Sequence, residues 1–383
     1  MRVLLDCRMA YWSGVGRYTV GLTRALAARE DLEIVIVVGR VNLNSPAAAE
    51  PILPPELARR VTAYVVSGHP FSPAGAFDFG RIIRKAAPDV THCLHFPTPI
   101  PAQRPLAVTM HDLSPLLVPG LMPSFVKRAV YRAWNARAVR VASRIIVDTA
   151  FTVGEIERVF PSAIGRVIPV ALAVDDFSAG QPEPLEAPLA DIVRQPYVLS
   201  MGSTRPHKNL PTLLAAFTRL APMHPDLRLL LVGDDDSGYL TAQLPAETPA
   251  AIRERVSFTG RVSDGQLRTL YAGAAVFAYP SFYEGFGLPP LEAMALGAPV
   301  VTVEAASLPE VVGKAALLVP PGDPVALAAA IERVLTEPTL RDRLIAAGRA
   351  RAAEFTWAAT AEASVNVYRE VLNMDGALFK IHP

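Results

Sequence analysis

The sequence predicts an α/β protein with two doubly wound domains, each built around a parallel β-sheet. Three observations favour this fold. Short apolar runs rich in β-branched residues alternate with helical patterns along the chain. The length of 383 residues exceeds that of a typical single domain and suits two domains of ordinary size. Residues 175–196 are rich in Pro, Ala and Gly and lack periodicity, which predicts a linker between two halves.

The first half carries short apolar runs of the kind that form buried parallel strands. Helical patterns lie between these runs, over Gly16–Arg29 and Pro123–Val141. We expect these elements to form a first domain over residues 1–174. The predicted strands are Val3–Asp6, Glu33–Val38, Val61–Val65, Val90–Cys93, Ala107–Met110, Arg144–Val147 and Arg166–Val170.

The second half restarts the same alternation without repeating the sequence. It predicts a second domain over residues 197–356 and a terminal segment, 357–383, within a helical pattern that begins at Phe355 and runs to Leu372. Doubly wound domains bind ligands at the carboxyl ends of their strands, so two such halves imply a ligand cleft between them. The predicted strands are Tyr197–Met201, Leu227–Val232, Val256–Phe258, Ala275–Tyr279, Val300–Val303 and Ala316–Val319.

Bulk composition argues against several classes of protein. The net charge of +1 gives no general case for nucleic-acid binding. Cys7 and Cys93, the two cysteines, provide no disulfide framework and suit a reducing cytosol. Asp6 and Arg8 interrupt what a signal peptide would need as an apolar core, and no apolar run approaches the ~20 residues of a membrane span. The sequence therefore predicts a cytoplasmic protein that is soluble or at most peripheral to a membrane.

The most informative segment is Tyr279–Gly297, with the sequence YPSFYEGFGLPPLEAMALG. A buried strand ends at Tyr279, a glycine-rich corner follows, and Pro289 and Pro290 suit the first turn of a helix. The free amides of such a turn favour an anion such as a phosphate. Glu284 precedes the helix and Glu292 lies within it, so both carboxylates are placed to bind hydroxyl groups of one ligand. The segment predicts a phosphate-bearing sugar as that ligand.

The string EGFGLPPLE, with Pro-Ser before it and Ala-Met-Ala-x-Gly-x-Pro-Val after it, resembles the signature of retaining glycosyltransferases with the GT-B fold. That family includes sucrose synthases, glycogen synthases and bacterial α-mannosyltransferases. The resemblance covers nearly the whole chain and is stronger from Tyr197 onward. It implies two Rossmann-like domains facing each other across a cleft, an N-terminal one for the acceptor and a C-terminal one for the nucleotide-sugar donor. It also implies a terminal helix that crosses back to the first domain.

The resemblance implies a set of donor-binding residues. Glu284 would hold sugar hydroxyls, Glu292 the ribose, and Arg205 and Lys208 the diphosphate, while the loop at Val262 would border the base. A solvated basic loop is the alternative for the two cations, and a tight turn is the alternative for the glycines after the first strand. The full implied set is Gly14, Gly16, Arg205, Lys208, Val262, Glu284, Gly285, Phe286, Gly287, Leu288 and Glu292.

His111 and Asp112 follow a predicted strand of the first half. By resemblance to mannosyltransferases, His111 would contact the donor sugar and its transition state, with Asp112 orienting the ring. Catalysis would then rest on His111, Asp112, Glu284 and Lys208. The pair His92 and His95 has poor spacing for zinc. The run 234–236, three aspartates, reads best as a solvated turn, so we expect an enzyme without metal or cofactor.

The predicted function is transfer of a sugar, with mannose from GDP-mannose as the favoured donor, to a hydroxyl of a lipid-linked or surface glycan precursor. The alternatives are rhamnosyl, glucosyl or galactosyl transfer from another nucleotide sugar, a sugar-nucleotide epimerase, and a non-catalytic nucleotide-sugar-binding protein. No carboxylate is placed as a nucleophile, so the resemblance implies front-face transfer in which the departing diphosphate accepts the acceptor's proton.

The segment 124–145 carries many arginines that a helical wheel gathers on one face, with Val126, Val130 and Trp134 among the apolar residues of the other. Such a helix is typical of an anionic membrane surface. An ordinary helix packed on its sheet with a solvated basic face is an equal alternative.

Overall fold

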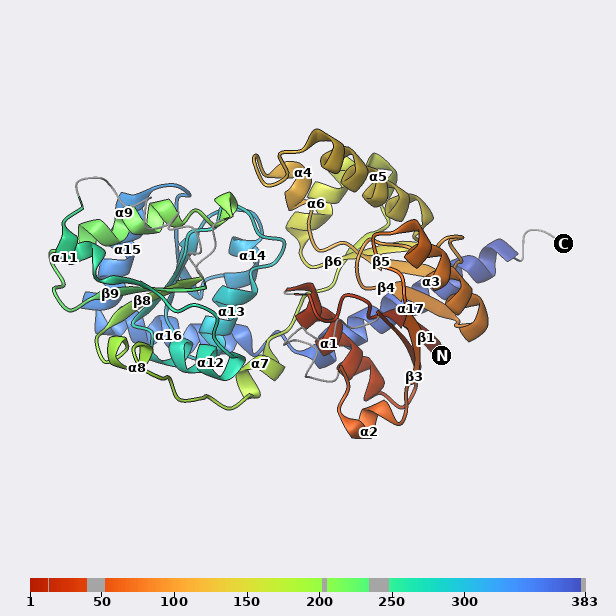
Figure 1. The fold of residues 1–383 in the computed structure, drawn as a ribbon, viewed down its shortest axis with the longest axis horizontal. Coiled ribbons are helices and arrows are strands. Elements are labelled where there is room, and N and C mark those ends of the chain that lie inside the picture. Colours follow the sequence, from red (N-terminus) through yellow and green to blue (C-terminus); the bar gives the residue numbers. More distant parts are fainter. Residues whose placement is uncertain (13, 40–51, 202–204, 234–247, 380–383) are drawn as a thin grey trace. The chain divides into compact units, whose positions relative to one another are not determined.

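The computed structural model describes residues 1–12, 14–39, 52–201, 205–233 and 248–379, with side chains up to residue 374 (Figure 1). It divides into two compact units of similar architecture. Unit 1 comprises Met1–Leu117, Met122–Ala173 and Trp357–Pro383, and unit 2 comprises Val118–Leu121 and Val174–Thr356. Within the described residues, no helix is both long and apolar enough to cross a bilayer.

Unit 1 contains a seven-stranded parallel sheet in the order β3-β2-β1-β4-β5-β6-β7. Its strands are β1 (Arg2–Asp6), β2 (Glu33–Gly39), β3 (Thr62–Val66), β4 (Val90–Cys93), β5 (Leu106–Thr109), β6 (Arg144–Val147) and β7 (Val167–Pro169). Its helices are α1 (Val15–Ala27), α2 (Pro55–Ala58), α3 (Pro73–Ala86), α4 (Ser114–Leu117), α5 (Phe125–Val141), α6 (Ala150–Val159), the short 3₁₀ helix η2 (Pro161–Ala163) and α17 (Trp357–Phe379).

Unit 2 contains a six-stranded parallel sheet in the order β10-β9-β8-β11-β12-β13. Its strands are β8 (Tyr197–Met201), β9 (Arg228–Val232), β10 (Val256–Phe258), β11 (Val276–Tyr279), β12 (Val300–Val303) and β13 (Ala316–Val319). Its helices are α7 (Asp175–Ala179), α8 (Leu189–Ile192), the 3₁₀ helix η3 (Pro206–Lys208), α9 (Leu210–Leu220), α11 (Ala250–Arg253), α12 (Asp264–Gly273), α13 (Leu288–Ala295), α14 (Leu308–Val312), α15 (Pro324–Thr336) and α16 (Pro338–Ala352).

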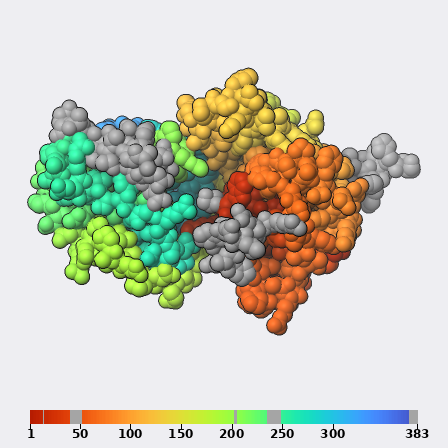
Figure 2. Space-filling model, viewed as in Figure 1, coloured from red at the N-terminus to blue at the C-terminus, as the bar shows by residue number. Residues whose placement is uncertain are grey.

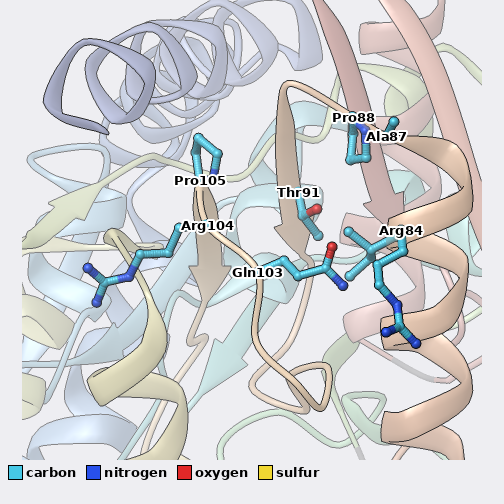
Figure 3. A pocket seen from close by; sticks show the side chains of 8 residues that line it. Arg84, Ala87, Pro88, Thr91, Gln103, Arg104 and Pro105 are labelled. Carbon is cyan, nitrogen blue, oxygen red and sulfur yellow. The ribbon is translucent and has the colours of Figure 1, made fainter. Parts of the chain in front are cut away.

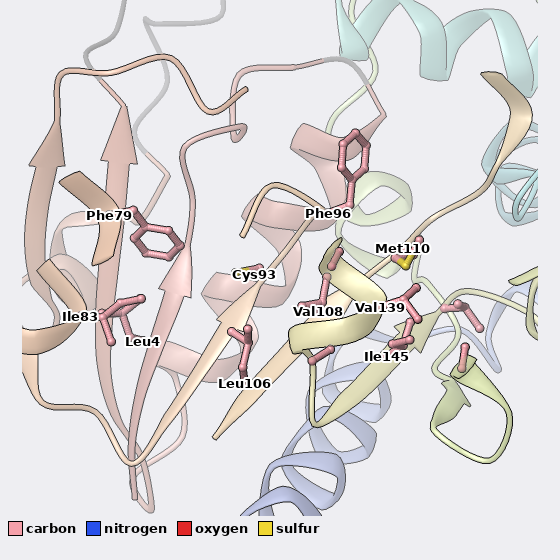
Figure 4. Close-up of a cluster of buried hydrophobic side chains, with 14 of the residues drawn as sticks. Leu4, Phe79, Ile83, Cys93, Phe96, Leu106, Val108, Met110, Val139 and Ile145 are labelled. Carbon is pink, nitrogen blue, oxygen red and sulfur yellow. The ribbon is translucent and has the colours of Figure 1, made fainter. Parts of the chain in front are cut away.

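Every strand predicted from the sequence is present, with ends that differ by no more than one residue. The apolar runs are nearly continuous because each strand is covered on both faces. In unit 1, Leu4 and Cys93 face a core that α3, α5 and α6 cover (Figure 4). His92, next to Cys93 on the same strand, faces the opposite side, where its Nδ1 lies 2.7 Å from the Tyr368 hydroxyl of α17. The terminal helix α17 thus packs on the unit 1 sheet together with α1.

The segment expected to be a linker, 175–196, differs from that expectation because it contains helices α7 and α8 and belongs to unit 2. Phe177 is buried, and the Arg268 guanidinium lies 4.8 Å from the centre of its ring. The Nε of Arg268 also donates a 2.6 Å hydrogen bond to the Phe177 carbonyl. Phe177, together with hydrogen bonds between Glu183 and α12, therefore fixes a segment whose composition suggested a linker.

Helix α5 buries only part of the apolar face that the helical wheel predicted. Ala138 and Val139 in its second half face the core, whereas Phe125, Val126 and Val130 in its first half are 83%, 69% and 52% exposed. The partly buried Tyr131 and Trp134, midway along the helix, also pack against that core. The space-filling view shows the surface around α5, in gold, as part of the outer face of unit 1 (Figure 2).

Candidate active site

In unit 2, residues 205–209 after β8 lie beside residues 280–284 after β11, because these strands are neighbours in the sheet although not in the sequence. Phe282 N and Ser281 Oγ donate hydrogen bonds of 2.7 and 3.0 Å to the His207 carbonyl. Asn209 Nδ2 donates to the Pro280 carbonyl at 3.2 Å. Strand order reverses at this point, which is where open α/β sheets bind their ligands.

These two loops bring Lys208 and Glu284 into direct contact with Tyr279. The Lys208 ammonium donates to Glu284 Oε1 at 2.7 Å and to the Tyr279 hydroxyl at 2.8 Å, and that hydroxyl donates to Glu284 Oε1 at 2.7 Å. Burial, reinforced by the Glu284 charge, raises the pKa of Tyr279 well above its usual value, so the phenol keeps its proton. The sequence prediction placed Lys208 and Glu284 on different parts of a ligand and missed Tyr279.

This arrangement leaves binding capacity for a ligand. An ammonium has three protons, of which Lys208 uses two on Tyr279 and Glu284. Among the described residues, Glu284 Oε2 receives no hydrogen bond. Both side chains keep some exposure, 19% for Lys208 and 14% for Glu284. Lys208 therefore presents a cationic N–H beside the anionic Oε2 of Glu284. The N–H suits a phosphate of the ligand, and the carboxylate oxygen suits a neighbouring hydroxyl.

Ser307 stabilises the glycine-rich corner between Glu284 and α13. Its Oγ donates hydrogen bonds to the Glu284 and Phe286 carbonyls at 2.9 and 2.7 Å. Gly287 begins α13 with φ of 110°, and a Cβ there would lie 2.9 Å from Leu308 Cδ2. Only glycine suits this backbone. Gly285 and Leu288 complete the corner that turns the chain from Glu284 into the helix.

Other residues of unit 2 that were predicted to bind the donor are not members of the Lys208–Tyr279–Glu284 group. Glu292 is only 3% exposed, and its Oε2 accepts a 3.1 Å hydrogen bond from the Tyr271 hydroxyl of α12. Arg205 is exposed immediately before η3, and Val262 lies in the loop between β10 and α12. A ribose role for Glu292 and a base contact at Val262 stay predictions.

In unit 1, the two glycines of the β1–α1 loop that were predicted to bind the donor are required by the local backbone. Gly16 lies against the backbone, where a Cβ would be 2.5 Å from the Ala10 oxygen. Its amide already donates to the Trp12 carbonyl at 2.6 Å, so the phosphate role expected for that amide is not supported. Gly14 caps α1 with φ of 72°, in the left-handed region.

His111 lies at the end of β5 and is oriented by Asp148, at the end of the neighbouring strand β6. Its Nδ1 is 2.9 Å from Asp148 Oδ2, and its Nε2 is 3.2 Å from the Leu94 carbonyl. Burial disfavours a charged ring, but the Asp148 carboxylate outweighs it and raises the pKa of His111. The ring of Tyr18 stands edge-on, with centroids 4.7 Å apart.

The prediction that Asp112 orients His111 is wrong. Asp112 Oδ1 instead accepts hydrogen bonds of 2.8 Å from the backbone amide and the hydroxyl of Ser114, where α4 begins. A short acidic side chain just before a helix is well placed to cap it. Asp148 was missed, although an acid directly after the apolar run of β6 could have drawn attention to it.

Of the two histidines considered for zinc, His92 has other partners. His92 joins Tyr368 to Thr109, whose Oγ1 lies 2.8 Å both from His92 Nε2 and from the Tyr18 hydroxyl. Burial lowers the pKa of His92 to about 3, so its ring is neutral. Within the described residues, no three His, Cys, Asp or Glu side chains gather as metal ligands would. The aspartates 234–236 lie outside the described residues.

A pocket of about 260 Å³ opens at the other edge of the unit 1 sheet (Figure 3). It lies where β4 and β5 begin, as the hydrogen bond from Thr91 N to the Pro105 carbonyl shows. Arg84 and Gln103 line it, and Gln103 Nε2 donates to the Gly80 carbonyl at 2.9 Å. None of the predicted site residues lines this pocket.

Comparison with protein families matches both units. The family model for glycosyl transferases group 1 matches residues 186–351, and that for the glycosyl transferase 4-like domain matches residues 13–172. O-antigen chain mannosyltransferase B of Escherichia coli is 32% identical over 375 residues, 93% of this chain and 96% of the relative. The serotype-specific mannosyltransferase WbdA of Escherichia coli is 29% identical over 97% of this chain, which spans about half (48%) of that longer relative.

Solved structures agree with the fold. Sucrose-phosphate synthase from Thermosynechococcus elongatus superposes with a TM-score of 0.75 at 22% identity, covering 98% of this chain and 100% of that one. HepE of Anabaena, in complex with UDP and glucose, gives 0.70 at 20% identity over 97% and 100% of the two chains. The GT-B fold expected from the sequence is confirmed.

Proposed function

The chain belongs to the group 1 glycosyltransferases with the GT-B fold, and from this premise we propose that it transfers mannose from GDP-mannose to a hydroxyl of a lipid-linked or surface glycan precursor. The carrying observation is the Lys208–Tyr279–Glu284 group, which offers one N–H and one carboxylate oxygen to a ligand. Support for mannose comes from the relatives, whose names describe mannosyltransferases.

The proposed reaction retains the configuration at the anomeric carbon. The bond from that carbon to the diphosphate breaks, the acceptor oxygen bonds on the same face, and its proton passes to the departing diphosphate. The remaining N–H of Lys208 donates a hydrogen bond to the diphosphate as negative charge grows there. Arg205 and the Phe286–Leu288 amides contribute further N–H donors to the same phosphates. Glu284 accepts from sugar hydroxyls through Oε2. Tyr279 holds both side chains in place.

In the same proposal His111 acts as a charged group rather than as a base. Both of its ring nitrogens face acceptors, the Asp148 carboxylate and the Leu94 carbonyl, so both carry protons when Asp148 is ionised. An imidazolium has no lone pair with which to remove a proton. It stabilises negative charge near the reacting groups, which agrees with transfer of the acceptor's proton to the diphosphate.

Binding of nucleotides to the purified protein tests the donor. GDP and GDP-mannose are expected to raise the melting temperature without added metal, because ligands that bind only the folded protein stabilise it by mass action. UDP and dTDP sugars are the comparison set. Selective stabilisation by those compounds would retain a glycosyltransferase but refute GDP-mannose as its donor, and adding a chelator tests whether metal is required.

We further propose that the first half of α5 contacts an anionic membrane. Phe125 and Val126 are the most exposed of its apolar side chains, and Lys127 and Arg128 lie beside them in the same turn. Apolar side chains that enter the interface and cations that meet anionic head groups are what such binding needs. Arg137 takes no part, because its guanidinium donates to the Thr98 and Pro99 carbonyls.

Sedimentation with liposomes checks this surface. The double variants Phe125→Ala/Val126→Ala and Lys127→Glu/Arg128→Glu are each expected to lose binding to vesicles with anionic lipid. Charge reversal at Lys314, an exposed lysine of unit 2, is the matched control. If both α5 variants sediment like the unaltered protein, the basic face is merely solvated.

A further inference from the structure

Aromatic rings from three loops form one continuous group at the carboxyl edge of the unit 1 sheet. Trp12 follows β1, His69 and Phe71 follow β3, and His95 follows β4. The ring centroids of Trp12 lie 6.0 Å from His69 and 5.7 Å from Phe71, and those of Phe71 and His95 lie 6.2 Å apart. We call Trp12, His69, Phe71 and His95 the aromatic cluster.

The cluster continues into the candidate active site of unit 1. The ring of His95 lies 5.7 Å from that of His111, with an interplanar angle of 30°. From Trp12 to His111 the rings thus form an unbroken series through Phe71 and His95. A ligand that rested on Trp12 would extend along this series toward the His111–Asp148 pair.

Two observations indicate that the cluster does more than fill a loop. Trp12 is 43% exposed, although an indole gains most from burial when it serves only for packing. Its neighbour Phe71 packs partly against the hydrophobic core, so the exposed ring rests on a fixed support. In addition, His95 Nδ1 is shielded from solvent and has no hydrogen-bond partner in the described part of the chain. Buried polar atoms without partners are uncommon and call for an explanation.

We propose that the aromatic cluster binds a pyranose ring of the glycan that accepts the transferred sugar, an inference that rests on the proposed function. One face of a pyranose carries C–H groups of slight positive character, which stack on the negative face of an aromatic ring. The hydroxyls around its edge can accept from the Nε2 of His69, whose Nδ1 already accepts a hydrogen bond from the Phe71 amide. Burial lowers the pKa of His95 well below its usual value, so that ring is neutral and suits an uncharged sugar.

Binding of free sugars, measured without any nucleotide, tests this site. Methyl α-mannopyranoside and a mannose trisaccharide serve as probes, with saturation-transfer NMR and calorimetry as readouts. Trp12→Ala is expected to weaken binding about tenfold, since one aromatic stacking contact is of that size. Trp12→Phe keeps an aromatic face and should retain most of the affinity. Phe77→Ala, which removes a 53% exposed phenylalanine on α3, is the matched control.

The outcomes separate this inference from the proposed function. Equal sugar binding by Trp12→Ala and Phe77→Ala would overturn the site, and so would the absence of any sugar binding by the unaltered protein. Loss of liposome binding in Trp12→Ala with sugar binding intact would favour a lipid ligand and refute the sugar. The melting-temperature shift with GDP reports on the donor alone and should be unchanged in Trp12→Ala. A missing GDP shift with sugar binding that depends on Trp12 would refute the donor and support the cluster.

Discussion

Replacing Glu284 with glutamine is expected to lower kcat by about 10²- to 10³-fold, the usual loss when one preorganised polar contact to the reacting groups is removed. Glu284 Oε1 accepts from both Lys208 and Tyr279 at 2.7 Å. A neutral amide weakens both hydrogen bonds and also the contact to a sugar hydroxyl that we propose for Oε2. Radiolabelled sugar transfer under saturating donor and acceptor measures the loss.

Two further variants make this result interpretable. Glu254→Gln, the same change at an exposed position just before β10, should keep full activity. Tyr279→Phe removes the hydroxyl that joins Lys208 to Glu284 but neither charge, so a smaller fall of about tenfold is expected from the two lost hydrogen bonds. The melting temperature of each variant reports on the fold. Near-normal turnover of Glu284→Gln with an intact fold would remove Glu284 from the site.

The strands were predictable because local sequence determines them. A parallel strand covered on both faces needs a short run of apolar, β-branched residues, as in β12, and little else in the chain has that pattern. The same reasoning located Lys208 and Glu284 in loops that follow strands. It did not reveal their contact, since 76 residues separate them and only the order of strands in the sheet brings β8 beside β11.

Errors arose where a feature depended on tertiary packing. Asp112 adjoins His111 in sequence, but the backbone turns after β5 and directs that carboxylate to the start of α4. Asp148, 37 residues away, reaches His111 because β5 and β6 are paired. The helical wheel of α5 left open whether its apolar face packs or meets a membrane, and it did not reveal that Ala138 is buried whereas Val126 is exposed.

Burial of the Asp148 carboxylate beside His111 costs desolvation free energy. Asp148 is 3% exposed, and burial raises the pKa of its carboxyl despite the nearby His111. The folded protein therefore disfavours the charged form of Asp148 relative to the unfolded chain. Buried ion pairs often stabilise no more than apolar residues of similar size. Its position at the sheet edge where ligands bind favours a role in the reaction.

Asp148→Asn is accordingly expected to reduce kcat by about 10²-fold, as loss of one preorganised charged contact to the reacting groups does. In the unaltered protein the pKa of His111 is raised above 6.5, so its proton stabilises the fold fully below pH 6.5 and this contribution is lost as pH rises through the folded-state value. Without the carboxylate, burial lowers the pKa of His111, opposed only by the Asp112 charge and the Leu94 carbonyl.

An NMR titration of the His111 Cε1–H signal checks the sign. The midpoint should lie above 6.5 in the unaltered protein and at lower pH in Asp148→Asn, and the alkaline limb of the kcat profile should move to lower pH by the same interval. Asp112→Asn is the informative comparison, because Asp112 affects His111 through charge alone, without a hydrogen bond, and its loss should move the midpoint less. A larger shift in Asp112→Asn would restore Asp112 as the orienting residue. Equal midpoints in the unaltered protein and Asp148→Asn would show that His111 does not depend on Asp148 for its charge.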